Sequence, residues 1–541
     1  MDPGTKAEVA TLIEGLPRQR DQLIEMLHRI QDAKGCLPIA SLRALGEILG
    51  MAAAEVYEVA TFYHHFDVIH EGEPAPPPVT VRVCGSLSCA LAGSEALRRD
   101  LASRVGAEVR VVPAPCMGRC EMAPAVVVGG HPVGHATLPA IEAALGAGDV
   151  APPVPAPISC REYVVAGGYR LYAECVTGMR SRDEVIDIVD DAQLRGLGGA
   201  GFPAGRKWRI VRGEPAPRFL AVNADEGEPG TFKDRRCLEL DPHRFLEGAL
   251  IAAWAIEAAA IYIYLRDEYA GCRLALEREL EALRSHVPAE CRPLPPIHLR
   301  RGAGAYICGE ESAMLESIEG RRGLPRLRPP YVAQRGLFGR PTLEHNLETL
   351  FWVPTIVERG AAWFATHGRR GRKGVRAFSV SGRVQRPGVY LAPAGITARE
   401  LIDEFAGGML PGHTLYAYLP GGASGGILPA SLADIPLDFD TLAEYGAFVG
   451  SAAVIVLSDH DRAADAARNV MAFFRDESCG QCTPCREGTR QAAELMRAPR
   501  WDRALLGELC DAMADASICG LGQAAPNPIR SVLRYFPHEV E

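Results

Sequence analysis

The sequence predicts a multidomain chain in which α/β and α+β units alternate with helical ones. Its 541 residues are enough for roughly three to four domains. Two groups of closely spaced cysteines, and two glycine-rich turns beside a buried strand, mark the parts that carry chemistry. Pro-rich stretches at residues 71–78 and 151–158 indicate joints between units.

Composition limits the class of protein. A 48% hydrophobic and 23% charged chain is typical of a globular protein, and a net charge of −9 argues against a nucleic-acid-binding surface. The first residues lack the basic and apolar segments of a signal peptide. The longest apolar run, residues 245–265, contains Glu247 and Glu257, which favours a buried helix and strand over a membrane span. We therefore expect a cytoplasmic protein without membrane insertion.

The amino-terminal residues 1–70 predict a helical bundle, because apolar side chains recur at helical spacing between residues 23 and 30. His64 and His65 follow in the segment VATFYHHF. Adjacent residues on a helix do not face each other, and no nearby residue completes a metal site. A packed bundle is therefore favoured over a metal centre at these histidines.

The first cysteine group lies in two loops at strand ends. A predicted strand at residues 79–84 ends in Cys84, with Cys89 shortly after it, and Cys116 and Cys120 follow a second strand. Four thiolates from two such loops can hold a [2Fe–2S] cluster. A structural zinc site and ordinary buried thiols are the alternatives, and disulfides are disfavoured inside the cell.

Helices and strands alternate from about residue 160 to residue 372, which predicts an α/β unit. Its central stretch, residues 195–236, places glycine-rich turns on both sides of a buried strand, Phe219 to Val222. The letters GLGGAG fit the dinucleotide pattern, but they follow a helix, residues 181–194, whose carboxyl end Gly196 would terminate. The true fingerprint follows a strand, so the stretch indicates a phosphate cradle of another nucleotide fold.

A second glycine turn, in GAGAYICGEES, delivers Tyr306, Gly309, Glu310 and Glu311 to the start of a helix. Paired carboxylates would repel a phosphate, so they are better suited to accept hydrogen bonds from ribose hydroxyls or the nicotinamide amide. The basic runs at residues 321–328 and 369–376 are most simply solvated loops. The alternative is that they face a partner or the cofactor's phosphates.

The carboxyl-terminal part, from about residue 462, is helical and carries the second cysteine group. Three closely spaced thiols and one remote thiol form the arrangement that holds a [4Fe–4S] cluster, with zinc as the alternative: Cys479, Cys482, Cys485 and Cys519. The other eight cysteines are scattered and are expected to be small buried apolar residues.

The segments GLGGAGFPAGRKW and NADEGEPGTFKDR resemble the flavin- and NADH-binding signature of the flavoprotein subunit of respiratory complex I. The helices, cysteine strand, helix and cysteine loop before them are similar to the thioredoxin-like [2Fe–2S] subunit. The resemblance implies five units: a helical bundle (1–70), a thioredoxin-like [2Fe–2S] domain (79–150), a Rossmann-like FMN- and NADH-binding α/β domain without the dinucleotide fingerprint (160–372), a β-grasp domain (374–458) and a helical [4Fe–4S] domain (462–541).

The resemblance also implies which residues contact FMN and NADH: Gly196, Gly198, Phe202, Lys207, Asn223, Asp225, Glu226, Glu228, Tyr306, Gly309, Glu310, Glu311, Tyr331, His345 and Asn346. Phe202 and Tyr331 would stack on adenine, unless they are aromatic residues that pack their own loops. Glu228 and Glu311 would position the nicotinamide nucleotide, and Glu228 would repel a 2′-phosphate, which favours NAD over NADP. Leu197 and His345 depart from the family's Arg and Asn. No catalytic acid, base or nucleophile is implied, because FMN performs hydride transfer.

Over nearly the whole chain the sequence resembles the β (diaphorase) subunit of NAD-dependent molybdenum or tungsten formate dehydrogenases. That resemblance implies a partner α subunit with a metal–pterin site and further Fe–S clusters. Electrons from formate would pass through the clusters to FMN and, reversibly, as hydride to NAD⁺. The alternatives are the diaphorase subunit of a soluble NAD-reducing hydrogenase, a fused complex I component, and a non-catalytic Fe–S scaffold without flavin.

Overall fold

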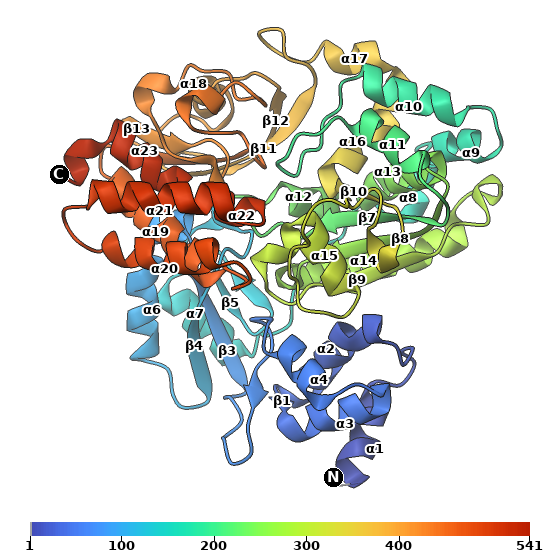
Figure 1. The fold of residues 1–541 in the computed structure, drawn as a ribbon, viewed down its shortest axis with the longest axis horizontal. Helices are drawn as coiled ribbons and strands as arrows, with labels where there is room; N and C mark the ends of the chain where they lie inside the picture. Colours follow the sequence, from blue (N-terminus) through green and yellow to red (C-terminus); the bar gives the residue numbers. More distant parts are fainter. Residues whose placement is uncertain (1–2) are drawn as a thin grey trace.

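A computed structural model describes residues 3–541 (Figure 1). Its helices and strands form a helical bundle, a thioredoxin-like unit, a parallel α/β unit, a β-grasp unit and a carboxyl-terminal group of helices. These are the kinds of unit that the sequence predicts. None of the helices within residues 3–541 has both the length and the apolar character needed to cross a bilayer.

The amino-terminal bundle contains α1 (Pro3–Leu12), α2 (Leu23–Lys34), α3 (Ile39–Leu49) and α4 (Ala53–Ala60). The short parallel strands β1 (Leu37–Pro38) and β2 (Val68–Ile69) join its loops. It packs against the α/β unit, where the Tyr63 hydroxyl donates to Ser317 Oγ at 2.9 Å. His64 and His65 lie in the turn after α4, which ends at Ala60, so these two histidines are not on a helix.

The thioredoxin-like unit is a four-stranded sheet in the order β4–β3–β5–β6. Its elements are β3 (Val79–Cys84), α5 (Leu87–Leu91), α6 (Ser94–Ala102), β4 (Val109–Ala114), β5 (Val126–Val128), β6 (His131–Val133) and α7 (Leu138–Ala147). β3 is parallel to β4 and antiparallel to β5. The residue after Cys84 contacts α19 (Ala463–Asp476), where the Asn469 side-chain amide donates to Gly85 O at 2.8 Å.

The Pro-rich joint at residues 151–158 is packed along the α/β unit. The main-chain N–H of Ile158 donates to Leu240 O at 2.9 Å. There is no space for a side chain at Gly271, because the carbonyl of Pro153 occupies it. The joint is therefore a fixed connection in this structure.

The α/β unit is built on a parallel sheet in the order β10–β7–β8–β9. The strands are β7 (Arg218–Ala224), β8 (Ala258–Leu265), β9 (Ile297–Arg301) and β10 (Thr342–Asn346). The helices are α8 (Cys160–Val165), α9 (Arg170–Val176), α10 (Arg182–Asp191), α11 (Ala204–Arg212), α12 (Lys233–Leu240), α13 (Pro242–Ala255), α14 (Ala270–His286), α15 (Glu311–Ile318), α16 (Leu347–Arg359) and α17 (Ala361–Ala365).

The structure places the start of α10 close to the predicted position but its end earlier than predicted. α10 begins near the predicted position, since Ser181 is its N-cap and forms a capping box with Glu184. Its end was predicted wrongly, because Gln193 takes the left-handed backbone (φ 56°) that was expected at Gly196. Gly196 lies beyond the helix and donates its N–H to Phe202 O at 2.9 Å, which closes the glycine-rich turn instead.

The β-grasp unit has a mixed sheet in the order β12–β11–β15–β13–β14. Its elements are β11 (Val375–Gly382), β12 (Gly388–Pro393), α18 (Ala398–Glu400), β13 (Leu415–Leu419), β14 (Leu428–Pro429) and β15 (Ala453–Ser458). The last group of helices is α19 (Ala463–Asp476), α20 (Thr483–Leu495), α21 (Arg503–Ala516), α22 (Gly520–Ala524) and α23 (Asn527–Tyr535). Figure 1 shows these helices beside the β-grasp unit, with α22 reaching toward the α/β unit.

Candidate functional site

The candidate site lies at the carboxyl ends of β7 and β10. The chain proceeds from β7 to β8 and β9 on one side, whereas β10 lies on the other side of β7. Ligands of parallel α/β sheets bind at such a point, where the strand order reverses. Two connected cavities of about 230 and 650 Å³ open here, and they share Gly198, Asn223 and Asn346 in their linings.

Every residue that the sequence analysis assigned to FMN or NADH lines one or both of these cavities. The inner, smaller cavity is lined by Asp225, Glu226, Glu228 and Tyr306, and the outer one by Gly196, Phe202, Lys207, Glu311, Tyr331 and His345. Gly198, Asn223, Gly309, Glu310 and Asn346 line both. Their individual contacts with the cofactors remain predictions.

The glycine-rich turn is suited to hold an anionic, phosphate-bearing group. Among the described residues, none accepts a hydrogen bond from the main-chain N–H groups of residues 198–201. A Cβ on Gly198 would lie 3.0 Å from the Cβ of Asn346, so a side chain there would press on the strand end. Free amides and bare backbone at a cavity wall form the concave donor set that binds phosphate oxygens.

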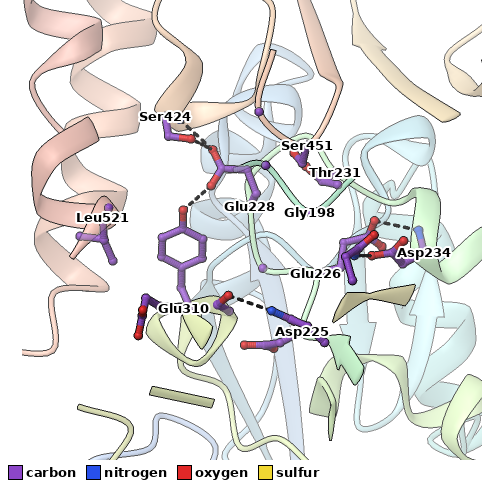
Figure 2. A pocket seen from close by; sticks show the side chains of 18 of the residues that line it. Gly198, Asp225, Glu226, Glu228, Thr231, Asp234, Glu310, Ser424, Ser451 and Leu521 are labelled. Atoms are coloured by element: carbon purple, nitrogen blue, oxygen red, sulfur yellow. Dashed lines mark hydrogen bonds between the residues drawn. The ribbon is translucent and has the colours of Figure 1, made fainter. Parts of the chain in front are cut away.

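The loop after β7 carries buried carboxyl groups into the inner cavity (Figure 2). Burial raises the pKa of Asp225 to about 8, and its Oδ2 atom has no hydrogen-bond partner in the described chain. Burial also raises the pKa of Glu226 to about 7, with the nearby Asp234 adding to the shift. An orphaned buried oxygen in a cavity is what a hydrogen-bonding cofactor would satisfy.

Glu228 crosses the inner cavity toward the β-grasp unit. Its carboxylate accepts hydrogen bonds from the N–H and the hydroxyl of Ser424, both at 2.7 Å, and from the Tyr306 hydroxyl (Figure 2). Phe202 and Tyr331, by contrast, line the outer cavity. The structure therefore does not bring Glu228 together with these two aromatic residues in one cavity. Its predicted place beside an adenine ribose stays a prediction.

Charged side chains converge in the outer cavity. Lys207 Nζ lies 3.0 Å from Glu344 Oε2 and 3.9 Å from Glu311 Oε2. Arg328 pairs with Glu310 and, at 3.1 Å, with Glu311. Phe202 and Tyr331 are 41% and 56% exposed, which is unusual for aromatic residues whose role is to pack a loop. The outer cavity therefore presents cations, carboxylates and aromatic faces that a nucleotide could contact.

His345 is held in one tautomer. Its Nε2 atom accepts a hydrogen bond from the Trp208 indole N–H at 2.7 Å, so the ring proton lies on Nδ1. Burial lowers the pKa of His345 well below its usual value, and Lys207 contributes to the shift. The ring is therefore a neutral donor at the cavity wall, and its N–H can replace the amide donor of the family's Asn.

Sequence reasoning missed two charged residues of the site. Lys233 is almost fully buried and pairs with Asp234 at 2.9 Å and with Glu348 at 3.0 Å, while lining the inner cavity. Glu344 is the main partner of Lys207. Both stand next to predicted residues, Lys233 within the NADEGEPGTFKDR segment and Glu344 beside His345, which was the available signal.

The second cysteine group adjoins the inner cavity. Gly520 and Leu521, which follow Cys519 directly, line that cavity. Burial raises the pKa of the Cys485 thiol to about 12, and the neighbouring Cys482, Cys519 and Cys479 add to the shift. Cys519 is thus close enough to the three closely spaced cysteines to influence Cys485, and its role as the fourth ligand of a cubane cluster stays a prediction.

The first cysteine group reaches the loop at residues 225–230 through Cys116, which lines a small cavity together with Asp225 and Gly227. Cys116 Sγ is 3.3 Å from Cys120 Sγ, and hydrogen bonds with Cys116 and Cys89 raise the pKa of Cys84 well above its usual value. Arg266 donates to Cys116 O at 2.7 Å and to the carbonyl of Glu226. The four thiols are therefore assembled beside the inner cavity.

A flavin-sized cavity with free amides, flanked by two assembled thiol groups, defines the chain as an iron–sulfur flavoprotein oxidoreductase. Family models match consecutive parts of the chain: a thioredoxin-like [2Fe–2S] ferredoxin (residues 9–147), the Nuo51 FMN-binding domain (189–355), an SLBB domain (378–428) and the NADH-ubiquinone oxidoreductase-F iron–sulfur binding region (465–541). The chain has an FMN-binding, a [2Fe–2S] and a [4Fe–4S] domain.

Curated relatives agree with these models. The chain is 42% identical over 389 residues to an F-type subunit of NADH-quinone oxidoreductase in Rhizobium meliloti, and the match covers 70% of this chain and 92% of the relative. It is 40% identical over 400 residues to the corresponding protein of Aquifex aeolicus, covering 71% and 91%. The chain belongs to this family of F-type NADH-quinone oxidoreductase subunits. It is an NAD(H)-, FMN- and Fe–S-dependent electron-transfer protein with NADH dehydrogenase activity.

A solved structure extends the similarity to almost the whole chain. A chain of NAD⁺-reducing [NiFe]-hydrogenase in the H₂-reduced state superposes with a TM-score of 0.83 at 32% identity. The match covers 97% of this chain and 93% of that one. The match therefore covers more of this chain than the 70% and 71% matched by the two NADH-quinone oxidoreductase relatives.

Proposed function

We propose that the chain is the diaphorase subunit of a multi-subunit complex that reduces NAD⁺ with electrons from a partner subunit, as NAD⁺-reducing hydrogenases do. The observation that carries the proposal is the extent of similarity. A hydrogenase chain matches 97% of this chain, whereas the NADH-quinone oxidoreductase relatives match about 70%. Because the hydrogenase match leaves almost none of this chain uncovered, it includes the fused [2Fe–2S] unit.

FMN would occupy the connected cavities at the ends of β7 and β10. When bound, it supplies the conversion between hydride transfer and single-electron transfer. The free amides of residues 198–201 would bind its phosphate, and Asn223 would fix its position from the strand end. Asp225, which is protonated below about pH 8, would donate a hydrogen bond to it. His345 would offer its Nδ1 proton from the opposite wall.

The nicotinamide nucleotide would enter through the outer cavity. Phe202 and Tyr331 would offer aromatic faces to its adenine, and Lys207 would compensate the charge of its phosphates. Glu311 would accept hydrogen bonds from the nucleotide. No side chain in either cavity is assigned as a general acid, base or nucleophile, because these residues bind and orient.

Electrons would leave the site through the two thiol groups. Gly520 and Leu521 connect the inner cavity directly to the Cys519 ligand, which supports the [4Fe–4S] cluster as the neighbour on the route to a partner. The [2Fe–2S] thiols reach the loop at residues 225–230 through Cys116 and would hold a second acceptor. We propose the sequence-derived domain boundaries, 1–70, 79–150, 160–372, 374–458 and 462–541, for this arrangement.

A formate dehydrogenase assembly is the second candidate. It is supported by the sequence resemblance to β subunits of NAD-dependent formate dehydrogenases, which includes the segments ASGGILPAS and ESCGQCTPCREGT. In that assembly a molybdenum- or tungsten-pterin α subunit with further Fe–S clusters would oxidise formate. The NAD(H) half-reaction of this chain would be the same.

The test is anaerobic purification of the tagged chain from its native host, with its partners attached. NAD⁺ reduction is then measured with H₂ and with formate. H₂-dependent activity supports the hydrogenase assembly, and formate-dependent activity overturns it in favour of the second candidate. NADH-driven dye reduction by the isolated chain is the control for the diaphorase core. An iron-loaded, folded chain without flavin or dye reduction would overturn both candidates and support a scaffold.

A further inference from the structure

Two histidine rings meet in the interior where the amino-terminal bundle packs on the α/β unit. His28 lies on α2, and His65 lies in the turn after α4. Their ring centroids are 4.9 Å apart, and His28 is only 2% exposed. The side chains of His65 and of Asp267, which follows β8, are 16% and 12% exposed. The sequence analysis rejected a metal site at His65 because no nearby residue completes one, but the fold supplies distant ones.

Each ring has one nitrogen atom engaged by an acceptor. His28 Nε2 lies 2.9 Å from Gly302 O, and a carbonyl oxygen only accepts, so Nε2 carries the proton. His65 Nδ1 lies 2.6 Å from Asp267 Oδ2, which likewise requires the proton on Nδ1. In the neutral rings the lone pairs therefore lie on His28 Nδ1 and His65 Nε2.

These two nitrogen atoms are buried and have no hydrogen-bond partner among the described residues. An unsatisfied buried polar atom is costly, and two lone pairs cannot satisfy each other without a proton or a cation between them. One nitrogen atom of each ring and an oxygen atom of Asp267 all lie within 4.8 Å of one another. The cluster therefore has the dimensions of a single-ion site.

We propose that this cluster binds a divalent transition-metal ion, Zn²⁺, with His28 Nδ1 and His65 Nε2 as nitrogen ligands. Metal-bound histidines almost always donate their other ring N–H to a carboxylate or a backbone carbonyl, which orients the ring. Asp267 and Gly302 make these two contacts here. Water would complete the coordination, and imidazole ligands suit zinc.

The surrounding charges are compatible with a cation. Arg301 pairs with Asp267 at 2.5 Å and with Asp32 at 2.6 Å. Arg300 pairs with Asp21 at 2.9 Å, and the Glu25 carboxylate accepts the main-chain N–H of Arg301 at 2.8 Å. Each arginine thus has its own carboxylate partner. A bound ion would join the bundle to the α/β unit, independently of flavin and of the two thiol groups.

The first experiment measures zinc per chain by elemental analysis. The full, iron-loaded chain is equilibrated with Zn²⁺ and then passed through a desalting column. Two variants remove one proposed ligand each while keeping the hydrogen bond of the other nitrogen: His28→Gln retains a donor to Gly302 O, and His65→Asn retains a donor to Asp267. Each is expected to lose about one zinc ion per chain, since a missing ligand abolishes a two-histidine site.

His413→Asn is the matched control. His413 belongs to a second group, with Asp459 and His460, whose ligand atoms also lie within 4.8 Å of one another, but that group is largely exposed. This variant should retain as much zinc as the unmodified chain. All variants should retain the iron content and the rate of NADH-driven dye reduction. Equal zinc in the unmodified chain and in His28→Gln, or loss confined to His413→Asn, would overturn the proposal.

X-ray absorption at the zinc edge tests the ligands without relying on the variants. The zinc-loaded, unmodified chain should give only nitrogen and oxygen neighbours at about 2.0–2.1 Å. A sulfur shell at about 2.3 Å would assign the zinc to cysteines and overturn the proposal. Failure of the iron-loaded chain to retain any zinc would do the same.

Discussion

Asn223 and Asn346 are register partners on adjacent parallel strands, at the carboxyl ends of β7 and β10. The Asn223 amide donates to Gly309 O at 2.9 Å, and the Asn346 side chain caps α16 by accepting the N–H of Glu348. The two residues thus fix the second glycine turn and a helix to the strand ends. Gly198 lies against Asn346, so the first glycine turn is fixed at the same place.

The first prediction concerns this contact. Gly198→Ala should weaken FMN binding about tenfold or more, because the new Cβ would lie 3.0 Å from that of Asn346 and overpacking costs about 1–3 kcal/mol. Flavin titration of the deflavinated chain, followed by fluorescence, measures the affinity. Gly146→Ala is the control, since no atom lies within 4 Å of its added Cβ and it is outside both cavities. Equal affinities for both variants would contradict the prediction.

The second prediction concerns the cation of the outer cavity. Lys207→Met should raise the KM for NADH about tenfold or more, because Glu344 and Glu311 would lose their shared counter-charge beside an anionic nucleotide. Steady-state dye reduction measures KM, and flavin content is counted on the same sample. Lys373→Met, at an exposed lysine, should leave KM unchanged. An unaltered KM in Lys207→Met would exclude this role.

The third prediction concerns pH. The pKa of Asp225 is about 8 in the folded chain and about 3.9 in an unfolded one, so between these values the folded chain binds more protons. The contribution of Asp225 to stability must then fall as pH rises from about 4 to about 8. Asp225→Asn should remove that contribution, which makes the unfolding midpoint of the flavin-free chain less dependent on pH.

Urea unfolding at a series of pH values measures this effect. The difference between variant and unmodified chain isolates Asp225 from Glu226, whose raised pKa acts in the same direction. Asp100→Asn, at an exposed carboxylate, should preserve the slope of the unmodified chain. If Asp225→Asn also preserves that slope, the carboxyl group is not protonated in the folded chain at neutral pH.

The fourth prediction separates the two thiol groups. Cys519→Ala should lower iron by about four atoms per chain, and Cys84→Ala should lower it by about two. Cys510→Ala is the control, because Cys510 is equally buried but belongs to neither group. Iron analysis with electron paramagnetic resonance of the reduced samples measures both losses. Loss of the same amount in both cluster variants would disprove the assignment of separate centres.

The strongest parts of the sequence prediction came from local patterns. The start of the helix near residue 181 and the strand at Phe219–Val222 were confirmed, because short-range hydrogen bonding and apolar runs decide them. The predicted iron–sulfur domains around the two cysteine groups were confirmed by family models, because the spacing of the cysteines can be read directly from the sequence. The end of α10 was not predicted, since Gln193 takes a left-handed backbone conformation that is uncommon for residues other than glycine.

Long-range pairings lay outside such reasoning. Lys233 and Glu348 stand 115 positions apart and meet only because α12 and α16 both begin beside the inner cavity. His28 and His65 meet only once the bundle has packed on the α/β unit. Local sequence patterns cannot predict a contact between residues that are far apart in the sequence and that only the packing of the folded units brings together.

The packed joint at residues 151–158 has a consequence for assembly. Because the two-iron unit and the flavin unit share one polypeptide, they are made in equal numbers and cannot be lost from each other by dilution. Pro153 and Ile158 contact the α/β unit, so the linker holds the two units close together. Their association is then intramolecular and occurs at a high effective concentration. Translation of a single message therefore sets the ratio of the two redox modules, a task that separate subunits leave to regulated expression and binding.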